Sequence, residues 1–227
     1  MNRNVLKIIA LISMIVDHIG LVFFPEHIVF RLIGRLSFPI FAFFVAEGWF
    51  YTRSKKKYIL LMFIFMLISW VPYCLALNLP FYTVNVMGVF LLSIFGMFLI
   101  DKIRQDKTKK VMYLASFCLF LVVCLILEGL EIITMGVLGV VLPIVFYAYK
   151  ERTVARYVGA FIVLLAMAIT IIATEPIRFE AFRQFFGLLA LIPIMCYNSN
   201  VGRYKLKYLF YITYPLHLII IMLIKLI

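Results

Sequence analysis

Residues 5–51 read VLKIIALISMIVDHIGLVFFPEHIVFRLIGRLSFPIFAFFVAEGWFY. They contain two long apolar runs, Val5–Phe24 and Val29–Tyr51, which only four residues separate. Each run is long enough to cross a bilayer, because a transmembrane helix needs about 20 apolar residues. The gap is too short for anything but a tight turn, so this stretch predicts an antiparallel hairpin of two membrane-spanning helices.

The same pattern continues to the end of the chain. Of the 227 residues, 66% are hydrophobic and 14% are charged, whereas a soluble domain carries about 25% charged residues. This composition excludes a soluble globular protein and a disordered chain. We predict an all-α, polytopic integral membrane helix bundle, a single domain over residues 1–227 with about nine transmembrane helices. Beyond the first two, the predicted spans are Tyr58–Asn78, Asn85–Ile100, Val111–Leu127, Ile132–Tyr149, Arg156–Thr174, Phe179–Tyr197 and Tyr208–Leu226.

The charged residues predict the orientation of the bundle. The net charge is +12, but its distribution follows the positive-inside rule and does not indicate nucleic-acid binding. The N-terminus is expected in the cytoplasm and the C-terminus outside, in the plasma membrane of a bacterium. Basic residues gather in every second gap, at Arg53, Lys55, Lys56, Lys57, Lys102, Arg104, Lys107, Lys109, Lys110, Lys150, Arg152, Arg156, Arg203, Lys205 and Lys207. The intervening gaps hold Glu26, Glu128, Glu131, Glu175 and Glu180, with Arg178 and Arg183 as their basic residues.

Ionisable residues inside the predicted spans point to a functional site. Each charge near the bilayer centre costs about 2.5–3.5 kcal/mol on insertion scales, so such residues must pair with one another or face a wet cavity. Asp17 in the first span and Arg35 in the second reach similar depths on neighbouring helices. We expect these two residues to share one polar cavity with His18, Tyr214 and His217.

Simpler roles remain open for each of these residues. Asp17 and Arg35 could form an ion pair that is only structural. His18 and His217 could be histidines that only satisfy hydrogen bonds within the bundle. Glu47 could be a residue of the membrane interface that faces the basic cluster Arg53–Lys57.

Common catalytic and metal motifs are absent from the sequence. It contains no H-E-x-x-H, G-x-G-x-x-G, Walker A or G-x-S-x-G motif. Three dispersed histidines without a neighbouring cysteine do not predict a metal site. The four cysteines, Cys74, Cys118, Cys124 and Cys196, lie inside apolar spans and are expected to be small core residues. With no activated nucleophile in the sequence, acid–base chemistry is the favoured type of catalysis.

Several motifs together resemble those of the TraX family. They are ALISMIVDHIG (Ala10–Gly20), FRLIGRLSFPIFAFF (Phe30–Phe44), AEG (Ala46–Gly48), LISWVPY (Leu67–Tyr73), QFFGLLALIPIMCYN (Gln184–Asn198) and YLFYITYPLH (Tyr208–His217). The resemblance covers nearly the whole chain and is weakest between about residues 100 and 181. The chain departs from the family pattern at Trp70, at Met87–Gly88 and in YNSNVG before the last span.

This resemblance implies a membrane acyltransferase that moves an acetyl group from cytoplasmic acetyl-CoA to an acceptor at the outer face. The acceptor would be a pilin or peptide amine, or the hydroxyl group of a lipid-linked envelope sugar. His217 is the favoured base and His18 the alternative, with Asp17 orienting a histidine or holding Arg35. Arg35, together with Tyr214 or Asn85, would stabilise the thioester oxygen. Substrate-binding roles are expected for Tyr214, Arg31, Asn85, Glu47, Ser69, Gln184 and Asn198. The alternative functions are a non-catalytic subunit of a pilus or envelope assembly machine and a small transporter or flippase.

Overall fold

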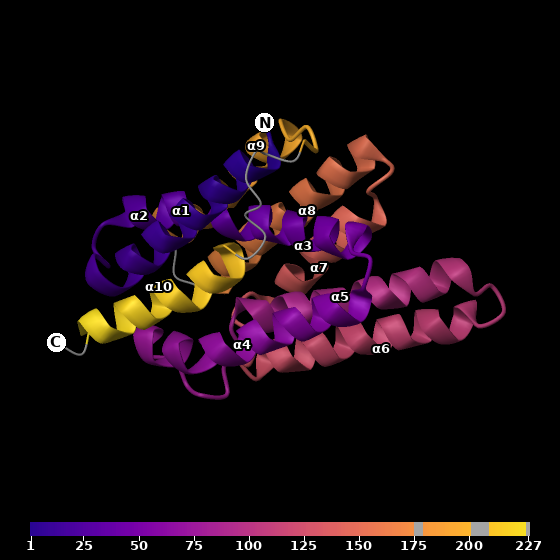
Figure 1. Ribbon diagram of the computed structural model, residues 1–227, viewed down its shortest axis with the longest axis horizontal. Helices are drawn as coiled ribbons and strands as arrows, with labels where there is room; N and C mark the ends of the chain where they lie inside the picture. Colours follow the sequence, from indigo (N-terminus) through magenta and orange to yellow (C-terminus); the bar gives the residue numbers. More distant parts are fainter. Residues whose placement is uncertain (175–178, 201–208, 226–227) are drawn as a thin grey trace.

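The computed structural model describes residues 1–174, 179–200 and 209–225, and every regular element in it is a helix. Figure 1 shows these helices as one elongated bundle. The elements are α1 (Arg3–Phe23), α2 (Ile28–Gly34), α3 (Ser37–Tyr51), α4 (Lys55–Leu77), α5 (Val86–Gln105), α6 (Lys110–Gly129), α7 (Gly136–Ala148), α8 (Thr153–Thr174), the 3-10 helix η1 (Phe179–Ala190), α9 (Leu191–Met195) and α10 (Leu209–Lys225). The predicted all-α class is therefore confirmed for the described part of the chain.

Six helical segments are long and apolar enough to cross a bilayer. They are α1, the combined α2–α3 segment Ile28–Tyr51, α4, α5, α6 and Thr153–Ala173 of α8. Three further apolar helices are shorter, Gly136–Ala148, Phe182–Met195 and Tyr211–Lys225. The protein is thus a helical membrane bundle in which, among the described residues, six of the nine predicted segments have the length of a full crossing.

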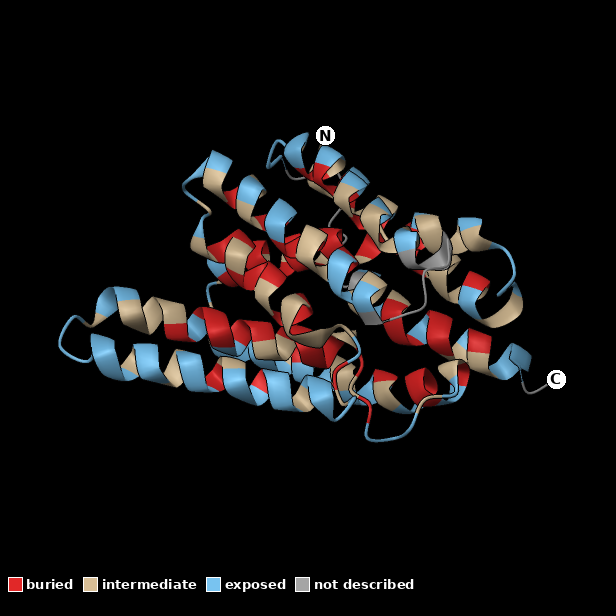
Figure 2. Cartoon of the chain, turned by 180° about the vertical axis from the view of Figure 1, so that it is seen from behind, coloured by how far each residue is buried: buried red, intermediate tan, exposed pale blue. Residues whose placement is uncertain are grey.

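The outer surface of the bundle matches a lipid environment. Large apolar side chains point outward, among them Leu119, Val122 and Leu125 of α6, which are 49–65% exposed. Figure 2 shows α6 exposed along most of its length, whereas the buried residues gather between the other helices. The centre of that core is α3, where Ile40, Ala42 and several neighbours are almost fully inaccessible.

Two glycines let α1 and α2 pack unusually close together. A Cβ atom at Gly20 would lie 2.1 Å from the Cβ of Phe30, and one at Gly34 would lie 2.0 Å from Oδ1 of Asp17. Both distances are far shorter than a van der Waals contact, so any side chain at these positions would push the helices apart. The turn Phe24–His27 joins the two helices, as the hairpin prediction required.

The second predicted span is divided into α2 and α3. The sequence predicts one continuous helix over Val29–Tyr51, but a turn at Arg35–Leu36 interrupts it. Pro39 has no N–H to bond the carbonyl of Arg35 four residues earlier. The hydroxyl of Ser37 donates instead to the carbonyl of Gly34 at 2.7 Å. These two features explain the break, which lies directly beside the polar residues of α1 and α2.

The loops divide into two groups at opposite ends of the bundle (Figure 1). We call one the basic end, because its loops carry Arg53, Lys107, Lys109, Lys150 and Arg152. We call the other the opposite end, where the loops Phe24–His27 and Leu130–Met135 carry Glu26 and Glu131. Glu175, Arg178, Arg203, Lys205 and Lys207, and the predicted span limits Tyr208 and Leu226, lie outside the described residues.

Hydrogen bonds between distant segments hold each end together. At the basic end the amino group of Met1 donates to the carbonyl of Cys196 at 2.6 Å. At the opposite end the backbone N–H of Val84 donates to the carbonyl of Ile132 at 2.7 Å. There, Lys225 of α10 also donates to the side-chain oxygen of Asn78 at 2.6 Å.

Candidate functional site

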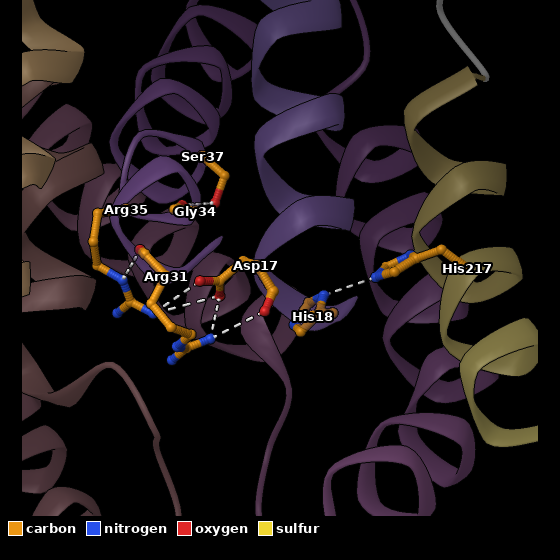
Figure 3. Close-up of polar contacts among 7 residues, drawn as sticks. All are labelled: Asp17, His18, Arg31, Gly34, Arg35, Ser37 and His217. Carbon is orange, nitrogen blue, oxygen red and sulfur yellow. Dashed lines mark hydrogen bonds and ion pairs between the residues drawn. The ribbon is translucent and has the colours of Figure 1, made fainter. Parts of the chain in front are cut away.

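A pair of histidines connects α1 to α10 inside the bundle. Nδ1 of His18 lies 2.8 Å from Nε2 of His217, and the two rings stack with centroids 5.0 Å apart. Figure 3 shows the two imidazoles meeting between their helices. His217 is only 6% exposed. The structure therefore joins two of the three histidines of the chain by a direct contact across 199 residues of sequence.

The second nitrogen of His217 determines how the pair shares its protons. Nδ1 of His217 lies 2.8 Å from the carbonyl oxygen of Thr213. A carbonyl oxygen only accepts, so this nitrogen carries the proton of a neutral ring and Nε2 is an acceptor. The proton between the two rings then belongs to Nδ1 of His18. Assigned from the hydrogen-bond network in this way, Nε2 of His18 keeps an unshared electron pair.

An ion cluster lies on the neighbouring face of α1. Nη1 of Arg31 is 2.8 Å from Oδ2 of Asp17, and Nη2 of Arg35 is 3.2 Å from Oδ1. The three side chains are only 13–15% exposed. The predicted contact between Asp17 and Arg35 is present, and Arg31 is the closer partner of the carboxylate. One carboxylate thus holds two guanidinium groups.

The two clusters are adjacent but separate. Asp17 faces α2, whereas His18 faces α10, as Figure 3 shows. Successive residues of an α-helix differ in direction by about 100°, which explains the separation. The sequence predicted a single polar cavity for these residues together with Tyr214. The structure instead arranges them as two clusters on different faces of α1.

A cavity of about 730 Å³ extends from the basic end toward the histidine pair. Its mouth carries four basic side chains, and its walls are mainly aromatic and aliphatic. Tyr214, one turn before His217 on α10, lines its inner part, and the rings of these two residues have centroids 5.7 Å apart. The residues at the mouth are Arg3, Lys7, Arg53 and Lys57, and the apolar wall includes Phe41, Phe44, Leu61, Met62, Met87 and Phe90.

Tyr214 presents a buried hydroxyl group to this cavity. The residue is 2% exposed, and its hydroxyl makes no hydrogen bond to any described residue. It lies near the backbone amide of Val86 without meeting hydrogen-bond geometry. Buried hydroxyl groups normally have partners, so this one is a candidate to bind a ligand.

Glu47 forms a second buried ion cluster at the basic end. Its Oε1 lies 3.0 Å from Nη2 of Arg156 and 3.2 Å from Nζ of Lys150. The alternative interpretation of Glu47 placed it against the basic cluster Arg53–Lys57. The structure pairs it instead with Lys150 of the turn that joins α7 to α8 and with Arg156 of the first turn of α8. Glu47 also lines the cavity.

Asn85 and Ser69 have structural hydrogen bonds. The side-chain oxygen of Asn85 caps α5 by accepting from the amides of Met87 and Gly88, and its amide group donates to the carbonyl of Met66 at 2.9 Å. Ser69 donates to the carbonyl of Phe65 within its own helix at 2.6 Å.

The remaining predicted residues are Gln184 and Asn198, and neither contacts the histidine pair. Asn198 belongs to the basic end, where its backbone N–H donates to the carbonyl of Met1. Gln184 is half-buried in η1 next to Arg183.

Three basic residues in or beside the two ion clusters were not predicted as site residues. Lys150 and Arg156 were assigned only to membrane orientation, and so was Arg183, which interacts electrostatically with Arg31. The signal for Arg156 was weak, because it is the first residue of the predicted span Arg156–Thr174, where a basic residue is expected from the positive-inside rule. Among the described residues, no group of three or more histidine, cysteine or acidic side chains is arranged to hold a metal ion.

These features define a helical membrane protein with a buried polar site below a cavity with a basic mouth. A family model described as TraX protein matches residues 2–225. The chain therefore belongs to the TraX family, which confirms the resemblance of the sequence motifs.

Two relatives with contrasting coverage are similar to this chain. It is 26% identical over 243 residues, 96% of each chain, to a protein of Dichelobacter nodosus named probable fimbrial assembly protein FimC, serogroup H1. It is 41% identical over 58 residues to an uncharacterized protein of Rickettsia prowazekii (strain Madrid E), which is 26% of this chain and 23% of that protein. No solved structure matches the chain.

Proposed function

We propose that the protein is a membrane-embedded acetyltransferase that moves an acetyl group from acetyl-CoA at the cytoplasmic face to an acceptor at the outer face. The observation that carries this proposal is the cavity, which has a basic mouth and an apolar wall and reaches Tyr214 beside the histidine pair. The TraX membership supports it, because the resemblance implies this chemistry.

The cavity suits acetyl-CoA in charge and in depth. The basic side chains at the mouth would attract the phosphate groups of the donor, and the apolar wall would accommodate its pantetheine arm. From Lys7 at the mouth, α1 advances eleven residues to His18, or about 16 Å at 1.5 Å per residue, and His18 itself lies outside the cavity lining. An extended pantetheine arm would span this depth and bring the thioester to the inner end of the cavity.

The histidine pair would supply the base. Nε2 of His18 accepts a proton from the acceptor amine or hydroxyl as the acceptor attacks the thioester carbonyl carbon. His217 holds the ring of His18 in the required tautomer through the contact between their nitrogens. This geometry favours His18 as the base, with His217 as its positioning residue, although the sequence favoured His217.

Tyr214 would stabilise the transition state. Its hydroxyl donates to the thioester oxygen as negative charge develops there. The new C–N or C–O bond forms, the C–S bond breaks, and the CoA thiolate leaves through the basic end. That thiolate takes up the proton released from the acceptor, so the reaction is balanced without a further reactant.

The proposed topology has nine crossings in a bacterial plasma membrane. The basic end then faces the cytoplasm, as the positive-inside rule requires, and the three shorter helices complete the crossings. A membrane-impermeant thiol reagent tests this orientation in intact cells, using a variant without the four native cysteines. It should label Glu26→Cys at the opposite end and spare Ser54→Cys at the basic end, and the reverse pattern would overturn the orientation.

The acceptor would be a pilin or peptide amine, or a sugar hydroxyl of a lipid-linked envelope glycan. The name of the Dichelobacter relative favours a pilin. The same name supports a second candidate function, a non-catalytic subunit of a pilus assembly machine.

Release of CoA from acetyl-CoA by the purified protein separates these functions. An acetyltransferase releases CoA in the presence of a peptide amine and gains thermal stability when CoA binds. Absence of both release and stabilisation would contradict the acetyltransferase proposal and favour the assembly subunit.

A further inference from the structure

The region beside His18 carries an excess of positive charge. Arg31 and Arg35 share the single carboxylate of Asp17. Arg183 of η1 is close enough to interact electrostatically with Arg31. We call these three arginines, together with Asp17, the arginine cluster. Among the described residues it holds three positive charges and one negative charge.

The helix η1 passes directly over the turn between α2 and α3. A Cβ atom at Gly187 of η1 would lie 3.6 Å from the carbonyl oxygen of Arg35. Arg183 precedes Gly187 by four residues in η1 and interacts electrostatically with Arg31. The cluster is thus enclosed by α1, the α2–α3 turn and η1.

Several donors of the cluster are not used. Nε of Arg31 and Nε of Arg183 are buried, and neither has a hydrogen-bond partner in the described part of the chain. Arg31 reaches Asp17 only through Nη1, which contacts both the carboxylate and the backbone carbonyl. Desolvated donors of this kind are costly unless a ligand completes them.

An anion with several oxygen atoms would satisfy these donors. Uncompensated cations are unfavourable in the low-dielectric interior of a membrane protein. The planar fork of a guanidinium group matches the paired oxygens of a carboxylate or a phosphate. No aromatic ring lies over Arg31, Arg35 or Arg183 within the described ranges, whereas the cations near Glu47 do have such rings.

We propose that the arginine cluster binds an anionic group, a carboxylate or a phosphate, on the acceptor substrate. This inference rests on the proposed acetyltransferase function and narrows its acceptor class. Asp17 and His18 are consecutive residues of α1 whose side chains differ in direction by about 100°. An anion bound by the arginine cluster would therefore lie on the face of α1 next to the one that carries the proposed base. Binding of that anion orients a nearby amine or hydroxyl of the same acceptor toward Nε2 of His18.

Matched peptide acceptors test the preference. Short apolar peptides with a free N-terminal amine would carry Asp, Asn, phosphoserine or Ser close to that amine. With the wild-type protein, kcat/KM for the Asp or phosphoserine peptide should exceed that of its neutral counterpart by at least about tenfold. A tenfold change corresponds to about 1.4 kcal/mol, which is the contribution expected of one strong ion-pair contact. A preference for Asp identifies the carboxylate as the ligand, and a preference for phosphoserine identifies the phosphate.

The variants Arg31→Gln and Arg183→Gln should bring this ratio close to one. The ratio is measured within each variant, so a smaller yield of folded protein does not change it. Arg183→Gln leaves both ion-pair partners of Asp17 in place, and Arg152→Gln at the basic end is the matched control that should keep the preference. Equal use of charged and neutral acceptors by the wild type, or a preference that survives both variants, would overturn the inference.

A measurement without catalysis separates this inference from the proposed function. With the cavity saturated by CoA, glutarate or inorganic phosphate should raise the unfolding temperature of the wild type more than chloride of equal ionic strength does. The rise should vanish in Arg183→Gln and grow in Asp17→Asn, because loss of the internal carboxylate leaves two guanidinium groups available. Stabilisation by these anions without acetyl transfer to any peptide would retain the anion site and reject the acetyltransferase. Acetyl transfer without anion preference and without stabilisation would reject the anion site alone.

Discussion

Two buried carboxylates, one near each end of the bundle, each hold two cations. Glu47 pairs with Lys150 and Arg156, and Asp17 pairs with Arg31 and Arg35. Each carboxylate is outnumbered by its two cations, and each group contains an arginine whose Nε is buried without a hydrogen-bond partner among the described residues. Their hydrogen-bond inventories therefore do not distinguish them.

The surroundings of the two clusters do differ. The guanidinium of Arg156 lies over the ring of Phe43 at 4.7 Å, and the ammonium of Lys150 lies over Phe50 at 3.6 Å and Tyr51 at 3.5 Å. Such rings stabilise desolvated cations. The cations around Glu47 are thus enclosed by this chain alone, which is the arrangement expected of a structural clamp between α3 and α8.

The arginine cluster has a histidine pair beside it in place of aromatic rings. Asp17 is followed directly by His18, which contacts His217 at 2.8 Å. A guanidinium pair without such rings among the described residues, next to a potential base, is the arrangement expected of a binding site. Two buried carboxylates with two cations each can therefore differ in function, depending on whether aromatic rings or a histidine pair lie beside the cations.

The largest effect should come from the histidine next to the arginine cluster. His18→Ala should lower acetyl transfer by about 10²–10⁴-fold, the usual contribution of a general base. His217→Ala should cause a smaller loss, because its ring only orients that of His18. The control is His27→Ala, since His27 is exposed in the α1–α2 turn beside Glu26 and should be dispensable. Full activity of His18→Ala would contradict the assignment of His18 as the base.

Neutral variants of the two carboxylates compare the clusters directly. Glu47→Gln and Asp17→Asn each leave two buried cations without a counter-charge, and breaking a buried ion pair costs about 3–5 kcal/mol. Thermal unfolding in detergent should show a large loss of stability for both. Phosphate or glutarate should restore Asp17→Asn but not Glu47→Gln. Equal restoration of both variants would show that the rings around Glu47 do not set the clusters apart.

The buried hydroxyl of Tyr214 should have an intermediate effect. Tyr214→Phe should reduce kcat for acetyl transfer by about 10²-fold, the lower range for loss of one donor to a developing oxyanion. Tyr211→Phe, which alters another tyrosine of the same cavity, is the matched control and should retain most activity. Steady-state kinetics would contradict the assignment if Tyr214→Phe changed only KM.

The smallest effects should occur at the mouth of the cavity. Arg53→Gln and Lys57→Gln should each raise KM for acetyl-CoA about two- to fivefold, because exposed charge pairs contribute about 0.2–1 kcal/mol. The increase should be larger at low salt than at high salt. Lys107→Gln and Lys109→Gln, in the α5–α6 loop outside the cavity, are the controls with the same charge change. An equal effect of all four variants would indicate general attraction and not a defined mouth.

The part of the site that depends on local geometry was predictable from the sequence. The short turn between the first two spans fixes the relative depth of Asp17 and Arg35, so their contact follows from the hairpin alone. The helical class follows from apolar segment length in the same way. The break between α2 and α3 was not predicted, although Pro39 and Ser37 supply its cause.

The parts that depend on helix packing were not predictable. The contact between His18 and His217 requires a particular rotation of α1 against α10, which residue spacing does not determine. Glu47 was compared only with the basic residues of the next loop, whereas its partners Lys150 and Arg156 are more than 100 residues away. Such pairings arise when α3 packs against α7, and no local pattern records that contact.

Acetyl transfer across a sealed membrane would show directly whether the donor and the acceptor bind at opposite ends of the bundle. Proteoliposomes would be prepared with one protein orientation, acetyl-CoA supplied only at the basic end and a charged peptide acceptor only at the opposite end. Transfer through the bundle should produce acetylated peptide in the compartment that contains no acetyl-CoA, and His18→Ala should abolish it. Acetylation only when donor and acceptor share one compartment would contradict transfer through the bundle.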